Sequence, residues 1–280
     1  MTDQPTRIID AHVHLWDPAR TDWYPYLARP SRMARRFDVG NYRSEAARWN
    51  VEKIINVAAA IGAQSVEETI ELDRSAEVNG GPDAIIGGLP PTDTVNEAIG
   101  LLDRQMTAPR FRGVRPMGGL DRPVPDPEVL RAMEERGLVF ELMARPDQLR
   151  AAAGQLAGYD GLSIVVEHTG WPRSDSEDER ALWQAGIDEL AGLGPNVACK
   201  LSGLAMPFET MKIEVLGPWL EYALQAFGVD RCMFASNFPV DSVYGTFDEL
   251  YDTFSAVTAS LDGPSRERLF ATNAERVYRC

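Results

Sequence analysis

The chain contains only three histidines among its 280 residues, and their positions are the first sign of chemistry. His12 and His14 are separated by one residue in an apolar segment, so in a β-strand both imidazoles point to the same side. His168 ends another apolar segment. Converging imidazoles can hold a divalent metal ion or donate hydrogen bonds to a substrate carbonyl group. We therefore predict that the three histidines form one active site.

Three further polar residues are candidates for catalysis. Lys200 and Glu141 lie inside apolar segments, where a charge is costly unless it has a partner. Lys200 could stabilise a developing oxyanion or bind a substrate carboxylate, or it could form a buried ion pair with Glu141. The general base is left open between Glu141, Asp241 and a neutral His168.

Strand alternation gives opposite expectations for two acidic residues beside the histidines. Asp10 stands two residues before His12 and is expected on the same side, where it could orient an imidazole. Glu167 directly precedes His168 and is expected to point away from the site, toward surrounding helices.

The elements that must position these residues are short apolar segments that alternate with segments of helical spacing. The apolar segments are almost continuously hydrophobic, which is typical of parallel strands buried on both faces. Eight such repeats in 280 residues predict an α/β fold, a single (β/α)8 TIM barrel, with reactive groups at the C-terminal ends of the strands. An open, doubly wound sheet would need a Gly-rich phosphate turn after the first strand, where this chain has histidines. The segments are Ile8–Trp16, Val51–Ala59, Ala84–Pro90, Phe111–Met117, Leu138–Ala144, Ser163–Gly170, Val197–Gly203 and Cys232–Pro239.

The longest irregular segment, about residues 17–42, is rich in Pro, Arg and aromatic residues. We expect it to form a lid over the mouth of one barrel domain that spans residues 1–280, because loops of this length in compact domains are usually functional. Trp23 and Tyr24 in this lid, and Trp171 after the sixth apolar segment, are predicted to contact the substrate.

The charge balance limits the classes of partner. The chain has 28 Lys and Arg against 42 Asp and Glu, a net charge of −14 that disfavours nucleic acids and anionic membranes. Arg115 and Arg145 nevertheless follow strands at the predicted mouth, where guanidinium groups could bind a small organic anion or a sugar acid. Three widely spaced cysteines, without a signal peptide or a long apolar stretch, indicate a cytoplasmic protein. The oligomeric state stays open.

Several motifs resemble those of the amidohydrolase superfamily in order and spacing. They are IIDAHVHLWDP from Ile8, EHTGWP from Glu167, CKLSGL from Cys199, FASNFPVD from Phe234 and NAERVYR from Asn273. The chain is most similar to the amidohydrolase-related branch that holds sugar-acid and dicarboxylate lactonases. The resemblance implies a TIM barrel that hydrolyses a lactone of a small carboxylated or polyhydroxy acid.

Two departures from the superfamily pattern concern the metal. The resemblance implies a histidine on the fifth strand and an aspartate at the end of the eighth, but this chain has Glu141 and Asn237 there. Asparagine can neither take a proton from water nor neutralise the charge of a metal ion, so the sequence disfavours a binuclear centre. One zinc ion on His12, His14 and His168 stays possible. We favour hydrolysis without a metal, in which the histidines donate hydrogen bonds to the carbonyl group and Asn237 binds the water or the substrate.

Two rival functions are kept. One is a related metal-dependent decarboxylase, against which Asn237 counts. The other is a small-molecule-binding barrel that has lost catalysis, against which the intact histidines and Lys200 count.

Overall fold

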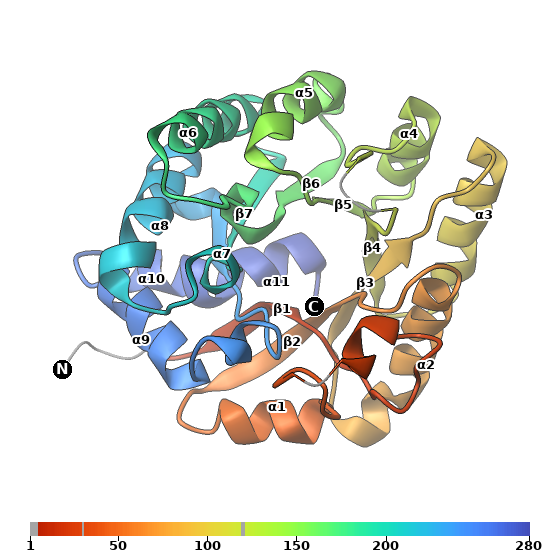
Figure 1. Ribbon diagram of the computed structural model, residues 1–280. Helices are drawn as coiled ribbons and strands as arrows, with labels where there is room; N and C mark the ends of the chain where they lie inside the picture. The colour runs from red at the N-terminus through yellow and green to blue at the C-terminus, as the bar shows by residue number, and fades with distance from the viewer. Residues whose placement is uncertain (1–4, 30, 119–120) are drawn as a thin grey trace.

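The computed structural model describes residues 5–29, 31–118 and 121–280. Within these ranges, eight parallel strands follow one another around a nearly closed barrel, which confirms the predicted TIM barrel (Figure 1). They are β1 (Ile8–Val13), β2 (Val51–Val57), β3 (Ala84–Leu89), β4 (Phe111–Pro116), β5 (Val139–Leu142), β6 (Ser163–Val166), β7 (Val197–Leu201) and β8 (Cys232–Phe234). The residues after β8 approach the end of β1, since the His14 amide donates to the Phe238 carbonyl at 2.8 Å.

The helices surround the strands (Figure 1). The α-helices are α1 (Val39–Glu45), α2 (Gln64–Asn79), α3 (Val95–Gln105), α4 (Pro127–Glu135), α5 (Pro146–Leu156), α6 (Glu177–Gly192), α7 (Ala205–Phe208), α8 (Ile213–Phe227), α9 (Phe247–Val257), α10 (Gly263–Glu267) and α11 (Asn273–Tyr278). Short helical turns are η1 (Pro25–Ala28), η2 (Glu167–Gly170), η3 (Val229–Arg231), η4 (Asp241–Val243) and η5 (Arg268–Thr272). Local sequence fixes several of their starts: Thr94 and Thr246 each cap a helix reciprocally with a glutamate three residues later. None of the described helices is both long and apolar enough to cross a bilayer.

The interior of the barrel is built from alternate, mostly aliphatic residues of the strands. α11 follows β8 through α9, α10 and η5, and it contributes Tyr278 to the same buried cluster. Arg112, near the start of β4, donates to the Tyr278 carbonyl, so α11 closes the N-terminal end of the barrel. The cluster comprises Ile9, Ala11, Ile55, Val57, Ala84, Ile86, Val139, Val165, Ala198, Met233, Ala235, Ala271, Ala274, Val277 and Tyr278.

The predicted lid leaves the barrel after β1 and returns beside its own start. Trp16 and Phe37 form an antiparallel bridge at the base of this loop. Helix α1 then begins at Val39 with Asp38 as its N-cap, so the last residues of the segment predicted as a lid are helical.

Candidate active site

The three histidines lie together at the C-terminal end of the barrel, as the sequence predicts. His12 Nε2 and His14 Nε2 are 3.2 Å apart, and the rings of His12 and His168 are 4.5 Å apart between centroids. All three side chains are buried.

Asp10 does not orient an imidazole, and this expectation is wrong. The pairing of β1 with β2 shifts by one residue between Asp10 and Val13, so a bulge breaks the alternation on which the expectation rested. The Asp10 carboxylate instead accepts hydrogen bonds from the Tyr42 hydroxyl at 2.7 Å and from the Ser236 amide at 2.8 Å.

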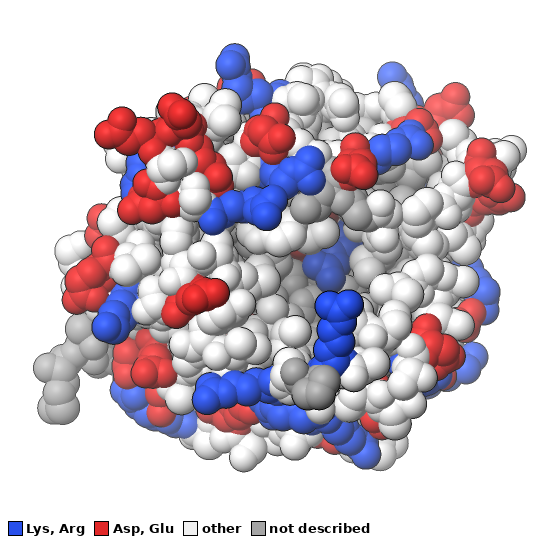
Figure 2. Space-filling model, viewed as in Figure 1, with Lys and Arg blue, Asp and Glu red and all other residues white. Residues whose placement is uncertain are grey.

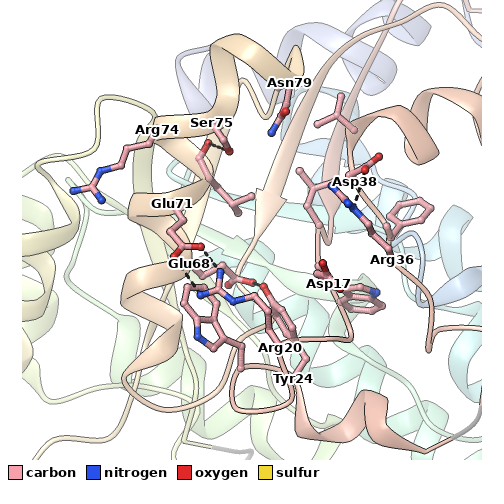
Figure 3. A pocket seen from close by; sticks show the side chains of 17 residues that line it. Asp17, Arg20, Tyr24, Arg36, Asp38, Glu68, Glu71, Arg74, Ser75 and Asn79 are labelled. Carbon is pink, nitrogen blue, oxygen red and sulfur yellow. Dashed lines mark hydrogen bonds and ion pairs between the residues drawn. The ribbon is translucent and has the colours of Figure 1, made fainter.

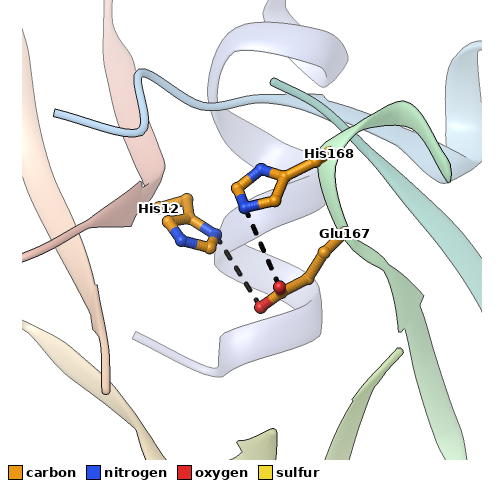
Figure 4. Close-up of side chains that lie close together, drawn as sticks. All are labelled: His12, Glu167 and His168. Atoms are coloured by element: carbon orange, nitrogen blue, oxygen red, sulfur yellow. Dashed lines mark ion pairs between the residues drawn. The ribbon is translucent and has the colours of Figure 1, made fainter. Parts of the chain in front are cut away.

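Glu167 does not point toward the helices, and this expectation is also wrong. Val165 of β6 faces the interior, and strand alternation therefore carries Glu167 to the same side. The backbone then turns into the left-handed region at His168 (φ 51°), which returns the imidazole to the barrel mouth beside Glu167 (Figure 4). Only the structure shows that Val165 faces the interior, so the sequence alone did not identify Glu167 as a site residue.

Glu167 is a buried anion between cationic and imidazole groups. Its Oε2 is 3.3 Å from Arg115 Nη1 and 3.9 Å from His168 Nε2, and its Oε1 is 3.9 Å from His12 Nδ1. Burial alone would raise the pKa of Glu167, but Arg115, His168 and the other nearby groups outweigh it and hold this pKa at about 2.

A divalent ion could be held by a set that differs from the predicted one. The ligand atoms of His12, Glu167 and His168 all lie within 4.8 Å of one another. This group contains Glu167 where the sequence prediction named His14. A carboxylate and two imidazoles are ligands that suit zinc.

Hydrogen bonding assigns different tautomers to His12 and His14. A carbonyl can only accept, so His14 Nδ1, 2.8 Å from the Val57 carbonyl, carries a proton. The remaining nitrogen of neutral His14 then accepts from His12 Nε2–H. This leaves His12 Nδ1 as an acceptor, and it faces the Lys200 ammonium at 3.4 Å.

The imidazole rings of all three histidines are neutral near pH 7. Burial, followed by the charge of Lys200, holds the pKa of His12 well below its ordinary value. Burial lowers the pKa of His14 to about 3, with Arg115 as the next cause. Burial also lowers the pKa of His168 to about 4, although the neighbouring Glu167 opposes this shift.

Lys200 and Glu141 form the buried ion pair that was one of the sequence alternatives. Lys200 Nζ lies 2.6 and 2.7 Å from the two oxygens of Glu141, and neither side chain is exposed. The Tyr278 hydroxyl also donates to Glu141, at 2.7 Å. The three N–H groups of Lys200 therefore have partners in Glu141 and His12, and Lys200 can act on a substrate only through His12.

Asn237 and Asp241 lie together beyond β8. Asn237 Nδ2 donates to Asp241 Oδ1 at 2.8 Å, which orients the amide. Among the described residues Asn237 Oδ1 has no hydrogen-bond partner, so it is an available acceptor. Burial raises the pKa of Asp241 to about 8, against the hydrogen bonds from Asn237 and the Ala205 amide.

The two arginines predicted to bind substrate differ in their surroundings. Arg115 is largely buried, donates to the Ala58 carbonyl at 2.5 Å and pairs with Glu167. Its Nε has no hydrogen-bond partner in the described ranges. Arg145 is the N-cap residue of α5, and its Nε lies 3.4 Å from Asp147.

The aromatic residues of the lid divide into two groups. Trp23 packs under the Arg20 guanidinium within the lid. Arg20 pairs with Glu71 of α2 and Tyr24 donates to Glu68 of α2 at 2.8 Å, so these two residues attach the lid to α2 (Figure 3). A cavity of about 390 Å³ lies between the lid and α2. Trp16 instead stacks on His14, with ring centroids 5.8 Å apart.

Two further aromatic side chains stand near the histidines. Tyr26 packs against Trp16 at 6.1 Å between centroids and is 41% exposed. The sequence did not identify Tyr26 as a site residue. Trp171 lies 6.5 Å from His168 between ring centroids, which places it beside the histidine cluster, and its contact with a substrate stays a prediction.

The face over the barrel mouth is hollowed at its centre, and Lys or Arg side chains appear in and beside the hollow (Figure 2). Asp and Glu side chains of this face lie mostly around its periphery (Figure 2). Basic side chains are thus present at this mouth although the chain has a net charge of −14.

Comparisons with known proteins agree with the barrel fold described above. The sequence profile of the Amidohydrolase family matches residues 9–280. The L-fucono-1,5-lactonase of Burkholderia ambifaria is 31% identical over 288 residues, which cover 97% of this chain and 95% of that protein. A zinc-bound amidohydrolase from Burkholderia multivorans has a TM-score of 0.81 at 24% identity, over 98% of this chain and 99% of its own.

A decarboxylase shares the fold as well. The 2,6-dihydroxybenzoate decarboxylase from Rhizobium has a TM-score of 0.64 at 15% identity, over 99% of both chains. At these identities the structural likeness concerns the fold alone, and one barrel supports different reactions.

Proposed function

Since the chain belongs to the amidohydrolase family, we propose that it hydrolyses the ester bond of a lactone of a small polyhydroxy or carboxylated acid. The observation that carries the proposal is the hydrogen-bonded series Lys200–His12–His14, which presents one imidazole donor and one imidazole acceptor at the barrel mouth. The 31% identity to an L-fucono-1,5-lactonase supports a sugar-acid lactone as the substrate.

Donors at the mouth would polarise the lactone carbonyl group. His12 Nε2–H would turn from His14 to the carbonyl oxygen, and Arg115 Nε–H would be a second donor. Lys200 holds the other nitrogen of His12, and Ala58 and Glu167 hold the guanidinium of Arg115, so both donors would stay near the developing oxyanion once His12 has turned.

Water would attack the carbonyl carbon with Asn237 and His168 as its partners. Asn237 Oδ1 would orient the water, and the neutral His168 imidazole would accept its proton while a C–O bond forms. Glu167 would stabilise the resulting imidazolium. The ring C–O bond then breaks, and the leaving alkoxide takes the proton from His168, which yields the open hydroxy acid.

We propose that this reaction requires no metal ion. A divalent ion on His12, Glu167 and His168 would supply Lewis-acid polarisation of the carbonyl. It would also bring a second positive charge close to the Lys200 ammonium, which already donates to His12 Nδ1. The hydrogen-bonded arrangement therefore supports catalysis by the side chains alone.

The first test is turnover of a panel of sugar-acid lactones, L-fucono-1,5-lactone included, before and after treatment with a chelator. We expect ester hydrolysis that is unchanged by the chelator, in protein whose elemental analysis shows substoichiometric metal. His12→Leu should lower kcat by about 100-fold, because one oxyanion donor is lost.

Other results would contradict separate parts of the proposal. Activity that the chelator removes and zinc restores would contradict a metal-free reaction. Decarboxylation of an aromatic acid without lactone turnover would favour the decarboxylase. Lactone binding without turnover would favour the binding barrel.

A further inference from the structure

Tyr278 of α11 reaches the active site from the opposite end of the barrel. Its side chain is fully buried in the barrel interior, and its hydroxyl donates to Glu141 Oε1 at 2.7 Å. Arg112 holds the Tyr278 carbonyl at 2.7 Å, and Lys53 holds the Cys280 carbonyl at 2.6 Å. The helix that carries this hydroxyl is therefore tied to β2 and β4.

The Glu141 carboxylate contacts both Tyr278 and Lys200, so the position of the Tyr278 hydroxyl affects the position of the Lys200 ammonium. Glu141 receives Tyr278 from one side and Lys200 from the other, with Lys200 Nζ bonded to both of its oxygens. The same ammonium lies 5.3 Å from the centroid of the Tyr278 ring. Two of the three N–H groups are thus directed at Glu141, which aims the third at His12 Nδ1, 3.4 Å away.

We propose that Tyr278 is a positioning residue that, through Glu141 and Lys200, stabilises the tautomer of His12 protonated at Nε2. The ammonium aimed at Nδ1 and the acceptor His14 Nε2 both hold the ring proton of His12 on Nε2, where it faces His14 and the barrel mouth. Without the tyrosine hydroxyl, the carboxylate loses its fixed orientation and the ammonium follows it. His14 is then the remaining contact that favours Nε2, and a fraction of His12 carries its proton on Nδ1.

The consequence for catalysis rests on the proposed function, but the effect of Tyr278 on the tautomer of His12 does not. The Tyr278→Phe variant keeps the ring and removes only the hydroxyl. Because outer hydrogen-bond partners usually contribute about 10- to 100-fold to activity, we expect kcat for the lactone to fall within this range. KM should stay within about twofold, since Tyr278 is remote from the mouth.

The direct test is long-range ¹H–¹⁵N correlation spectroscopy of the histidine rings in the full chain without substrate. With three histidines in the sequence, single His→Gln variants assign every ring. The wild type should show His12 protonated at Nε2 and His14 protonated at Nδ1. Tyr278→Phe and Glu141→Gln should both show His12 as a mixture of two tautomers. Tyr159→Phe removes a tyrosine hydroxyl that donates to the Pro127 carbonyl, outside this series, and should match the wild type.

A double-mutant cycle separates positioning from a general effect on packing. If Tyr278 acts through Glu141, its substitution should have almost no further effect on kcat in the Glu141→Gln background. The proposal is overturned if His12 keeps the Nε2 proton in both variants, or if the two effects on kcat multiply. A wild type without lactone turnover would refute the proposed function, and the tautomer spectra would then decide the role of Tyr278 alone.

Discussion

His12 and His14, which the sequence predicts to act as an equivalent pair, have different hydrogen-bonding roles in this site. His12 is a donor at Nε2 and His14 is an acceptor at Nε2, because the second nitrogen of each ring faces a different partner. One partner is the Lys200 ammonium and the other is the Val57 carbonyl. The residue type and spacing alone contain no information about these partners, which come from β7 and β2.

A substitution at Asp241 tests whether this residue is the general base. Burial raises the pKa of Asp241 to about 8, so near pH 7 it is largely a neutral acid that orients Asn237. Asp241→Asn keeps an oxygen acceptor for Asn237 Nδ2, and kcat should stay within about threefold of the wild type near pH 7.

Asp241→Leu is the matched variant that removes the oxygen acceptor for Asn237 Nδ2. It should lower kcat by about tenfold or more, because the Asn237 amide is then free to rotate. A loss of 100-fold or more in Asp241→Asn, measured by steady-state kinetics, would instead identify Asp241 as the base.

The residue-level predictions succeeded for the buried charge of Lys200 and failed where a bulge or a turn interrupts strand alternation. Lys200 in an apolar strand required a buried partner, and Glu141 is that partner. Strand alternation misled for Asp10 because a bulge intervenes, and for Glu167 because the left-handed turn at His168 brings adjacent residues to one side. Neither irregularity has a clear signal in one sequence.

At the level of elements, the eight apolar segments each contain one strand, and all eight extend beyond it. The sixth, Ser163–Gly170, continues through η2, where the chain leaves the sheet although it stays buried. Hydrophobicity reports burial, so it cannot mark the residue at which strand pairing stops. The lid was predictable as a long loop, but not its attachment to α2.

The attachment of the lid to α2 predicts a pH-dependent stability. Burial raises the pKa of Glu68 from 4.5 to about 7, against hydrogen bonds from Tyr24 and the amides of Ala59 and Ala60. The folded state then binds this proton more tightly than the unfolded state, so stability is highest below pH 4.5 and is lost as the pH rises through 7.

Urea unfolding at pH 4.5 and pH 8 measures this effect. Between these values the free energy of unfolding of the wild type should fall by about 3 kcal/mol more than that of Glu68→Gln. Glu71→Gln removes the adjacent exposed ion pair with Arg20 and should change stability by less than about 1 kcal/mol. Equal pH dependence in the wild type and Glu68→Gln would refute the assignment to Glu68.

At the scale of the whole molecule, the net charge of −14 does not describe the surroundings of individual cations. The buried Arg115 and Lys200 each lie against a buried carboxylate. Composition alone therefore predicted repulsion of anions, and only the positions of the arginines along the sequence indicated a cationic mouth.

Closure of the barrel by α11 predicts a large effect for a residue remote from the histidines. Arg112 donates to the carbonyls of Tyr278, Arg279 and Pro109. Arg112→Met should lower the free energy of unfolding by about 1 to 3 kcal/mol, because the partly buried Tyr278 carbonyl loses its charged donor.

Amide hydrogen exchange should also become faster in α11 of this variant. Arg150→Met, which breaks an exposed pair with Glu189, should change stability by less than about 1 kcal/mol. Unchanged exchange in α11 of Arg112→Met would show that other contacts suffice to hold the helix.

The series of hydrogen bonds from Tyr278 to His12 also has a consequence for synthesis of the chain. Tyr278 and Glu141 are 137 residues apart in sequence, and Lys200 and His12 are 188 apart. During translation, β1 and its histidines emerge before Glu141 and Lys200, and the Tyr278 hydroxyl that completes the series emerges after all of them. The nascent polypeptide therefore carries both histidines without the buried network that orients them until α11 has left the ribosome and closed the barrel.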